Sequence, residues 1–176
     1  VNLAREHDVC LIPYGGGTNV SDALQIPEAE TRTVVSLDMR RMNAIEWVDA
    51  DNLTACVQAG ILGSRLEELL EQDGFTCGHE PDSMELSTLG GWIATNASGM
   101  KRNRYGNIED IVENLTLVTP SGVVENLYWT PRQAAGVDGK NLDRGRIFGD
   151  EIHQHHVFRA QTVGERNRSV LRRDVL

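Results

Sequence analysis

Residues 13–21 of the chain read PYGGGTNVS, and the three consecutive glycines guide the interpretation of the rest of the sequence. They follow an apolar run at residues 9–12, which has the length and composition of a strand buried on both faces. Glycine is costly inside regular structure, and it is favoured where the backbone needs a positive φ or where another group must approach closely. The triplet therefore predicts a strand that ends in a closely approached loop.

The glycine triplet fits neither of the familiar phosphate-binding motifs. A P-loop would end in Gly-Lys followed by Ser or Thr, and a Rossmann fingerprint would open a long helix, whereas Thr18 and Asn19 follow here and Pro27 comes soon after. A glycine turn can still direct several backbone N–H groups into one concavity, and such a nest suits a diphosphate without any lysine. The alternative interpretation is a tight loop between strands that binds nothing.

Two later segments offer polar groups that suit the same kind of ligand. Residues 81–91 place hydroxyls and carboxylates before a helix-like start, where unpaired N–H groups favour phosphate or polarised ligand atoms. Residues 95–99 are small and polar, so a flat ring system could lie against their backbone. The alternatives are an ordinary N-cap at Ser87 or Thr88 and a crowded helix packed on a sheet.

The remaining pattern is that of an α+β protein. One helix is predicted from residue 65 to residue 73, with Ser64 as its N-cap, Glu67 completing a capping box and Gly74 ending it. A helical segment is also predicted at the start of the chain. Further strands are predicted at residues 33–37, 45–48 and 53–57, and a hairpin is predicted at residues 114–127 with its turn at 119–122.

Composition argues against several classes of protein. The chain has 176 residues and a net charge of -9, which does not suit sequence-independent nucleic-acid binding. No apolar run approaches the ~20 residues of a membrane-spanning helix, and no leader segment is recognisable at the start. The cysteines form no C-x-x-C pair and are predicted to be inert buried thiols: Cys10, Cys56 and Cys77.

The last part of the chain differs in character from the first. From residue 133 to residue 176 there are 8 basic and 6 acidic residues, against 9 and 20 before it, and hydrophobic periodicity is weak. We therefore predict a domain at residues 1–131 and a divergent, poorly ordered tail at residues 132–176. His153, His155 and His156 are interpreted as a solvated histidine run, and no metal site is predicted. His79 is interpreted as a structural loop histidine.

Three long segments in the right order resemble a known family: PYGGGTNVS, GHEPDSMELSTLGGWIATNASGM and YGNIEDIVENLTLVTPSG. They are similar to the flavin-binding domain of the vanillyl-alcohol oxidase and p-cresol methylhydroxylase superfamily, and within it to the alkyldihydroxyacetonephosphate synthases. The resemblance covers about residues 1–131. It implies a PCMH-type domain of two α+β subdomains, incomplete at both ends here, with FAD bound non-covalently between them.

The resemblance also implies which residues contact the cofactor. The first segment would hold the diphosphate, the second would flank the ribityl chain and the flavin ring, and the third would touch the flavin. The candidate cofactor-binding residues are Pro13, Tyr14, Gly15, Gly16, Gly17, Thr18, Asn19, Asp82, Ser83, Met84, Glu85, Leu86, Ser87, Thr88, Thr95, Asn96, Ala97 and Ser98. No catalytic residue is transferred, because the family's closing stretch and cap-domain residues have no counterpart in this sequence.

The function implied by the resemblance is that of a transferase in ether-lipid biosynthesis. Such synthases exchange the acyl group of acyl-dihydroxyacetone phosphate for a fatty alcohol, in peroxisomes, and homodimerisation of the full-length proteins is a further implied property. This chain is expected to supply FAD binding and to lack catalysis. The alternatives are an FAD-dependent oxidoreductase acting on a 2-hydroxy acid and a catalytically silent truncated product.

Overall fold

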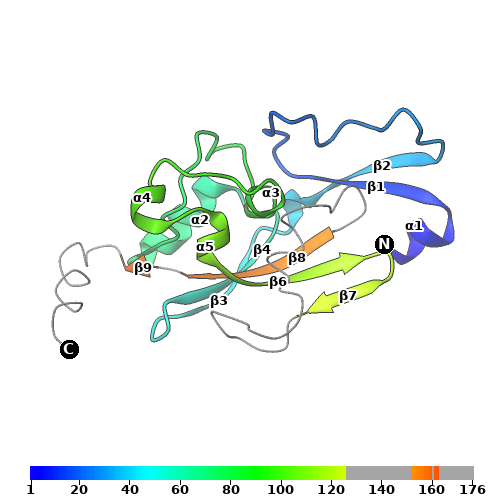
Figure 1. Cartoon of the computed structure of the whole chain (residues 1–176). Coiled ribbons are helices and arrows are strands. Elements are labelled where there is room, and N and C mark those ends of the chain that lie inside the picture. The colour runs from blue at the N-terminus through cyan, green and yellow to red at the C-terminus, as the bar shows by residue number, and fades with distance from the viewer. Residues whose placement is uncertain (126–151, 160, 163–176) are drawn as a thin grey trace.

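The computed structural model describes residues 1–125, 152–159 and 161–162, and it is a mixed arrangement of helices and strands (Figure 1). The predicted α+β class is confirmed. A short helix, α1 (Asn2–Glu6), leads into β1 (Val9–Tyr14), which pairs in parallel with β2 (Thr33–Asp38). A 3₁₀ turn, η1 (Met39–Arg41), follows β2.

The strand before the glycines is less buried than its sequence predicts. Within β1 only Cys10 is buried, and the other residues of the strand are half-buried. The prediction of a strand buried on both faces is therefore wrong for this structure. The physical reason is that β1 and β2 form a two-stranded sheet by themselves, so few described residues are available to cover either face.

A second sheet contains five antiparallel strands in the order β3-β4-β8-β6-β7 (Figure 1). The predicted strands and the predicted hairpin are found close to their expected places, and they are β3 (Ile45–Asp49), β4 (Thr54–Gln58), β6 (Val112–Thr119) and β7 (Gly122–Glu125). Thr119 pairs with Gly122 across the predicted turn.

The fifth strand of this sheet comes from the segment predicted to be poorly ordered. β8 (Ile152–Arg159) lies between β4 and β6 and pairs with both, and β9 (Gln161–Thr162) pairs with β5 (Phe75–Thr76). Two strands thus lie within the segment for which a poorly ordered tail is predicted, and that prediction for residues 132–176 as a whole stays a prediction. Backbone pairing needs little from the side chains, and β4 and β6 each offer an edge that requires hydrogen-bond partners. The domain boundary placed at residue 131 lies outside the described residues.

The long predicted helix is present, but its start differs from the prediction. α2 (Gly63–Gln72) ends as expected before Gly74, whose φ is +80°. Its N-cap is Leu62, with no capping side chain, so Ser64 is not the cap and no capping box forms. The carboxylate of Glu67 instead accepts hydrogen bonds from the Thr76 hydroxyl (2.7 Å) and from the N–H groups of residues 77 and 78. The Glu67 carboxylate therefore accepts hydrogen bonds from the loop at residues 76–78 and not from the backbone at the start of α2.

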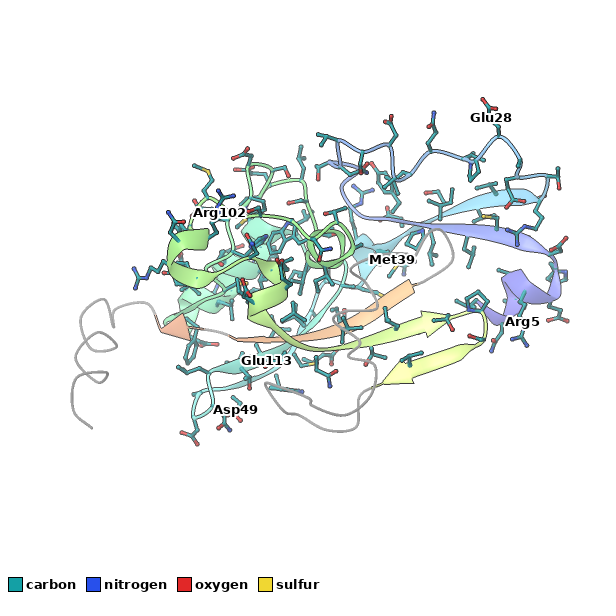
Figure 2. The ribbon with its side chains drawn as sticks, in the orientation of Figure 1. Arg5, Glu28, Met39, Asp49, Arg102 and Glu113 are labelled. Carbon is teal, nitrogen blue, oxygen red and sulfur yellow. The ribbon has the colours of Figure 1, made fainter. Side chains whose placement is uncertain are left out.

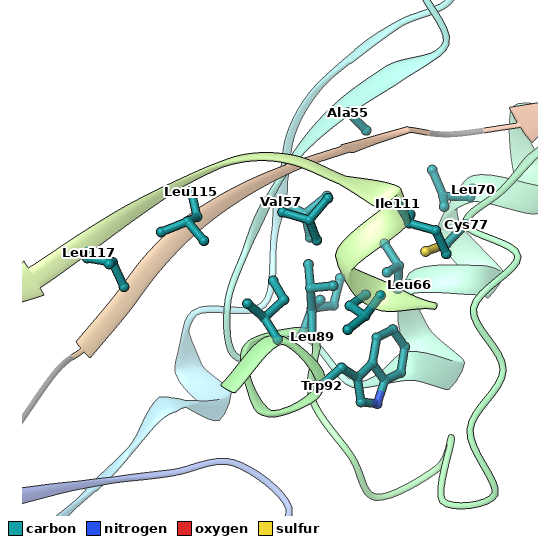
Figure 3. Close-up of a cluster of buried hydrophobic side chains, with 14 residues drawn as sticks. Ala55, Val57, Leu66, Leu70, Cys77, Leu89, Trp92, Ile111, Leu115 and Leu117 are labelled. Atoms are coloured by element: carbon teal, nitrogen blue, oxygen red, sulfur yellow. The ribbon is translucent and has the colours of Figure 1, made fainter. Parts of the chain in front are cut away.

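Three short helices follow: α3 (Leu89–Ala94), α4 (Arg102–Tyr105) and α5 (Ile108–Ile111). With α2 they pack on the five-stranded sheet and enclose the main hydrophobic cluster (Figure 3). The cluster draws all its members from residues 55–117: Ala55, Val57, Ile61, Leu66, Leu70, Cys77, Leu89, Trp92, Ile93, Ile108, Ile111, Val112, Leu115 and Leu117. The β1–β2 pair contributes nothing to it.

The cysteines are free, as expected, but they are not all buried. Cys10 and Cys77 are buried, whereas Cys56 is only half-buried, so the prediction is wrong for that residue. Burial raises the pKa of Cys77 to about 12, and burial also raises the pKa of Cys56. Both thiols therefore stay protonated and unreactive near neutral pH. Among the residues that the structure describes, no helix has both the length and the apolar character needed to cross a bilayer.

Candidate functional site

The glycine loop leaves β1 and packs directly against the segment that precedes α3. A Cβ added to Gly15 would clash with the hydroxyl of Thr88, and a Cβ added to Gly16 would clash with the backbone carbonyl of Leu86. Glycine is therefore required at both positions for these two segments to meet. The sequence predicts a close approach to the loop, and for these two glycines the approaching group is the protein's own second candidate segment.

The third glycine has a different role from the first two. Gly17 is exposed and adopts a φ of +65°, and a Cβ added there would lie 2.9 Å from the Tyr14 hydroxyl. The backbone N–H groups of Gly16, Gly17 and Thr18 make no hydrogen bond with other described residues. A residue with positive φ turns successive N–H groups toward one side, which creates an anion-binding concavity. Three unpaired donors beside a left-handed glycine fit a diphosphate group.

Asn19 closes the loop on its far side. Its side-chain oxygen accepts a hydrogen bond from the N–H of Ala23 at 3.0 Å. The side chain therefore stabilises the turn that follows the glycines, which is a structural contribution to the loop. Pro13 lies within β1 opposite Leu37, and the chain changes direction immediately after Tyr14.

In the second segment, the buried hydroxyls are committed to contacts within the protein. Thr88 is the N-cap of α3 and accepts from the N–H of Gly91 at 3.3 Å, which confirms one of the two N-cap interpretations. Ser87 is not a cap: its hydroxyl accepts from the Trp92 indole N–H at 2.7 Å and donates to the Ser83 carbonyl at 2.8 Å. These bonds fix the segment's shape where it meets the glycine loop.

The other members of the second segment divide between core and surface. Met84 packs against the hydrophobic cluster. Asp82, Glu85 and Leu86 are exposed, and 62% of the Leu86 side chain is accessible. The exposed side chains are the ones available to a ligand.

The third segment lies at the end of α3. Thr95 donates its hydroxyl to the Gly91 carbonyl at 2.8 Å, and Asn96 is exposed with a φ of +49°. Ala97 packs against the core, and Ser98 donates to the Asn107 side-chain oxygen at 2.8 Å. Contact of this segment with a flavin stays a prediction.

His79 is a buried polar side chain on the loop before these segments. It is 1% exposed, its ring lies 4.9 Å from that of Trp92, and neither ring nitrogen has a hydrogen-bond partner among the described residues. Burial lowers its pKa to about 4, so the imidazole is neutral at pH 7. Its packing against Trp92 agrees with the interpretation as a structural loop histidine.

A cationic side chain that the sequence interpretation missed stands beside the glycine loop. Arg40 lies on the turn that follows β2, next to Met39, which is labelled in Figure 2. Its guanidinium is 5.9 Å from the centre of the Tyr14 ring and is held by Asp38. The signal that could have located Arg40 is the parallel pairing of β1 with β2, because the carboxyl ends of parallel strands lie at the same edge of a sheet. Sequence alone does not reveal that pairing. In the described part of the chain no three His, Cys, Asp or Glu side chains gather into a metal site.

The arrangement defines a class of protein. The parallel strand β1 ends in a loop whose N–H groups at residues 16–18 have no partner among the described residues, and this loop packs on the segment before α3. The model of the FAD binding domain family matches residues 1–128, and the chain belongs to that family. FAD is the cofactor of the family, and the unpaired N–H groups of residues 16–18 fit its diphosphate.

Particular relatives share much of this sequence. The alkyldihydroxyacetonephosphate synthase of Caenorhabditis elegans is 53% identical over 135 residues, which is 77% of this chain and 23% of the relative. The synthase of Dictyostelium discoideum is 46% identical over 151 residues, covering 86% of this chain and 24% of the relative. A solved structure of alkyldihydroxyacetonephosphate synthase superposes with a TM-score of 0.80 at 41% identity, covering 92% of this chain and 29% of that structure.

These comparisons correct one expectation and show how much of its relatives' length the chain covers. The likeness to the Dictyostelium synthase extends past residue 131, because its 151 matched residues exceed that length. The resemblance therefore does not stop where the sequence interpretation ended it. The chain spans about a quarter of the length of the curated relatives that it matches first.

Proposed function

We propose that this chain binds FAD non-covalently, with the diphosphate at residues 15–18 and the flavin ring beside residues 82–88 and 95–98. The supporting observation is the junction at which Gly15 and Gly16 pack against Thr88 and Leu86, while the next N–H groups have no partner in the part of the chain that the structure describes. That junction brings together two of the three candidate segments, which are about 70 residues apart in the chain.

The residues of the site act mainly by holding shape. Thr88 and Ser87 fix the start of α3 and the segment before it, and Asn19 fixes the turn after the glycines. The backbone N–H groups of residues 16–18 are then presented without any rearrangement on binding, which lowers the entropic cost of capture. When bound, FAD supplies a reactive flavin ring, and the protein's contribution is orientation and electrostatics.

We further propose that the chain is the flavin-binding part of an alkylglycerone-phosphate synthase. The reaction is the exchange of the acyl group of acyl-dihydroxyacetone phosphate for a fatty alcohol, in which a fatty acid leaves and an ether bond forms. The support is the set of three relatives named alkyldihydroxyacetonephosphate synthase at 46–53% identity. The proposal includes a peroxisomal location and dimerisation of the full-length protein. We expect the 176-residue chain alone to lack transfer activity.

The absorbance spectrum of the purified chain after incubation with FAD and gel filtration tests the cofactor proposal. A flavin envelope that co-elutes with the protein at about one flavin per chain is expected. A well-folded preparation that elutes colourless would contradict the proposal. Release of intact FAD after heat or acid denaturation tests whether the attachment is non-covalent.

A redox function is the second candidate, because more distant relatives are oxidoreductases. The glycolate oxidase subunit GlcD of Bacillus subtilis is 33% identical over 122 residues. Anaerobic addition of a 2-hydroxy acid to the FAD-loaded chain tests this candidate. Bleaching of the flavin would support an oxidoreductase and contradict the synthase proposal.

A further inference from the structure

We propose that Arg40 is a diphosphate-binding residue of this site, and that its guanidinium supplies a charge-assisted hydrogen-bond donor that the glycine loop lacks. The inference rests on the proposed FAD function and extends it to a residue outside the three candidate segments. It stands on the pairing of two strands, a ring contact, an ion pair and the set of donors left over.

The first observation is the position of Arg40 at the ligand edge of the parallel sheet. Tyr14 pairs with Asp38 at the last position of the ladder, so the turn after β2 begins beside the start of the glycine loop. Ligands of parallel sheets bind outside the carboxyl ends of the strands. Arg40 therefore reaches the same edge as residues 15–17, although 23 or more positions separate them in the chain.

The second observation is a chain of contacts that links Arg40 to the loop. The guanidinium carbon lies 5.9 Å from the centre of the Tyr14 ring, within the range of a cation–π contact. The same ring faces Gly17, where an added Cβ would lie 2.9 Å from the Tyr14 hydroxyl. Tyr14 thus contacts the arginine and also lines the backbone of Gly17, so one side chain links Arg40 to the glycine loop.

The third observation is the way in which Asp38 holds the guanidinium. Arg40 Nη2 donates to Asp38 Oδ2 at 2.7 Å, Nε donates to Oδ1 at 3.0 Å, and the backbone N–H of Arg40 donates to Oδ1 at 2.9 Å. The hydrogen bonds from Arg40 lower the pKa of the Asp38 carboxyl to about 2, so the carboxylate stays ionised across the neutral range. The orientation of Arg40 is therefore set before any ligand arrives.

The fourth observation is that Asp38 does not use every donor of Arg40. A guanidinium carries five N–H donors, and Nη1 makes no hydrogen bond with other described residues. The side chains of both partners are about half exposed, at 53% for Arg40 and 47% for Asp38. An exposed ion pair of this kind is weak by itself, so a phosphate can share the guanidinium at little cost.

The net charge of the chain and the composition of the glycine loop explain why a cationic side chain matters at this site. Residues 13–21 contain no lysine or arginine, and the chain carries a net charge of -9. A diphosphate would therefore approach a protein that repels it at long range. The charge of Arg40 is balanced by Asp38, so the guanidinium acts at the binding site as a directed, charge-assisted donor to the phosphate.

The chain contains a matched control for this clamp. Glu30 and Arg32 form the same two-residue arrangement, with Nη2 of the arginine 2.6 Å from the carboxylate. That pair precedes β2 and lies at the opposite end of the sheet from the glycine loop. Arg41, which is adjacent to Arg40 and exposed, provides a second control for local charge.

The test is a calorimetric titration of the full chain and of three variants, Arg40→Gln, Arg41→Gln and Arg32→Gln, with FAD and with riboflavin, which has no phosphate. Losing one charge-assisted contact at a half-exposed site should weaken FAD binding about 10-fold in Arg40→Gln. Riboflavin binding should stay unchanged, and the two control variants should bind FAD within about 2-fold of the parent. Circular dichroism confirms that each variant is folded.

Each outcome separates this inference from the proposed function. FAD affinity of Arg40→Gln equal to that of Arg41→Gln would overturn the role of Arg40 while leaving the FAD site in place. An equal loss of riboflavin and FAD affinity would also overturn it, because the phosphate would not be the group recognised. Absence of FAD binding by the parent chain would overturn both. A shallower salt dependence of FAD affinity in Arg40→Gln alone would support a direct ionic contact.

Discussion

The two sheets of this protein differ in how many buried hydrophobic side chains they contain. The β1–β2 pair carries the glycine loop and Arg40, but within it and its following turn only Cys10 and Met39 are buried. The five-stranded sheet and its helices contain the whole main cluster, including Ile61, Leu66 and Leu89, each at 0% exposure (Figure 3). The binding loop therefore belongs to the region with less core of its own.

This difference indicates that the glycine loop is held in place by contacts between the two regions. One junction is the packing of Gly15 and Gly16 on Thr88 and Leu86. Another is at Gly60, where an added Cβ would clash with the backbone carbonyl of Met39. Glycine at these sites lets backbones meet where side chains would hold them apart. The stable region thus positions the less stable one.

The largest expected effect comes from the core of the five-stranded region. Leu66→Ala should lower the free energy of unfolding by about 4 kcal/mol, because it removes a fully buried side chain and leaves a cavity. Val35→Ala, in β2 and 42% exposed, should change it by no more than about 0.5 kcal/mol. Urea unfolding of both variants measures the contrast. Equal losses would contradict the view that the five-stranded region supplies most of the stabilising core.

The next effect is a loss of stability in acid from His79. Burial lowers the pKa of His79 from 6.5 to about 4. Between these pH values the imidazole is protonated in the unfolded chain and neutral in the folded protein. The free energy of unfolding should therefore fall as the pH drops from 6.5 to 4, by about 3 kcal/mol in total. Unfolding measured at several pH values tests this slope.

Two variants isolate the histidine's share of that slope. His79→Leu should remove this part of the pH dependence, whereas His7→Gln, which alters an exposed histidine, should keep it. A parent slope that survives in His79→Leu would place the titrating group elsewhere.

A smaller effect is expected at the junction between the regions. Gly60→Ala should cost about 2 kcal/mol, because the new methyl group must push the Met39 carbonyl away. It should also speed proteolytic cleavage in residues 20–32, since that loop belongs to the region that loses its support. Gly91→Ala is the matched control: its Cβ meets only the Thr88 hydroxyl, at 3.2 Å. Unchanged cleavage in Gly60→Ala would argue against dependence on the junction.

The sequence predicted those parts of the fold that local chemistry controls. The strands at residues 33–37 and 53–57, the hairpin turn and the end of α2 before Gly74 follow from alternation, turn residues and a positive φ. The start of α2 was mispredicted because the loop at residues 76–78 takes the Glu67 carboxylate. β8 was missed because its partners, β4 and β6, lie far away in the chain.

The candidate site shows the same division between local and long-range information. The glycine triplet and Thr88 were recognisable from residue type and spacing. Their packing on each other, and the approach of Arg40 to Tyr14, depend on tertiary contacts that no local pattern encodes. Ser87 was predicted to contact the cofactor, and the structure shows its hydroxyl occupied by Trp92 and Ser83.

Hydrogen exchange of the loop amides tests the central claim most directly. The N–H groups of Gly16, Gly17 and Thr18 have no partner among the described residues, so they should exchange rapidly in the protein without FAD. Saturation with FAD should slow their exchange by at least ~10-fold, while the N–H of Asp51, which donates to Asp49 Oδ1 in a distant turn, keeps its rate. FAD binding at one equivalent with unchanged exchange at residues 16–18 would contradict the claim that this loop holds the diphosphate.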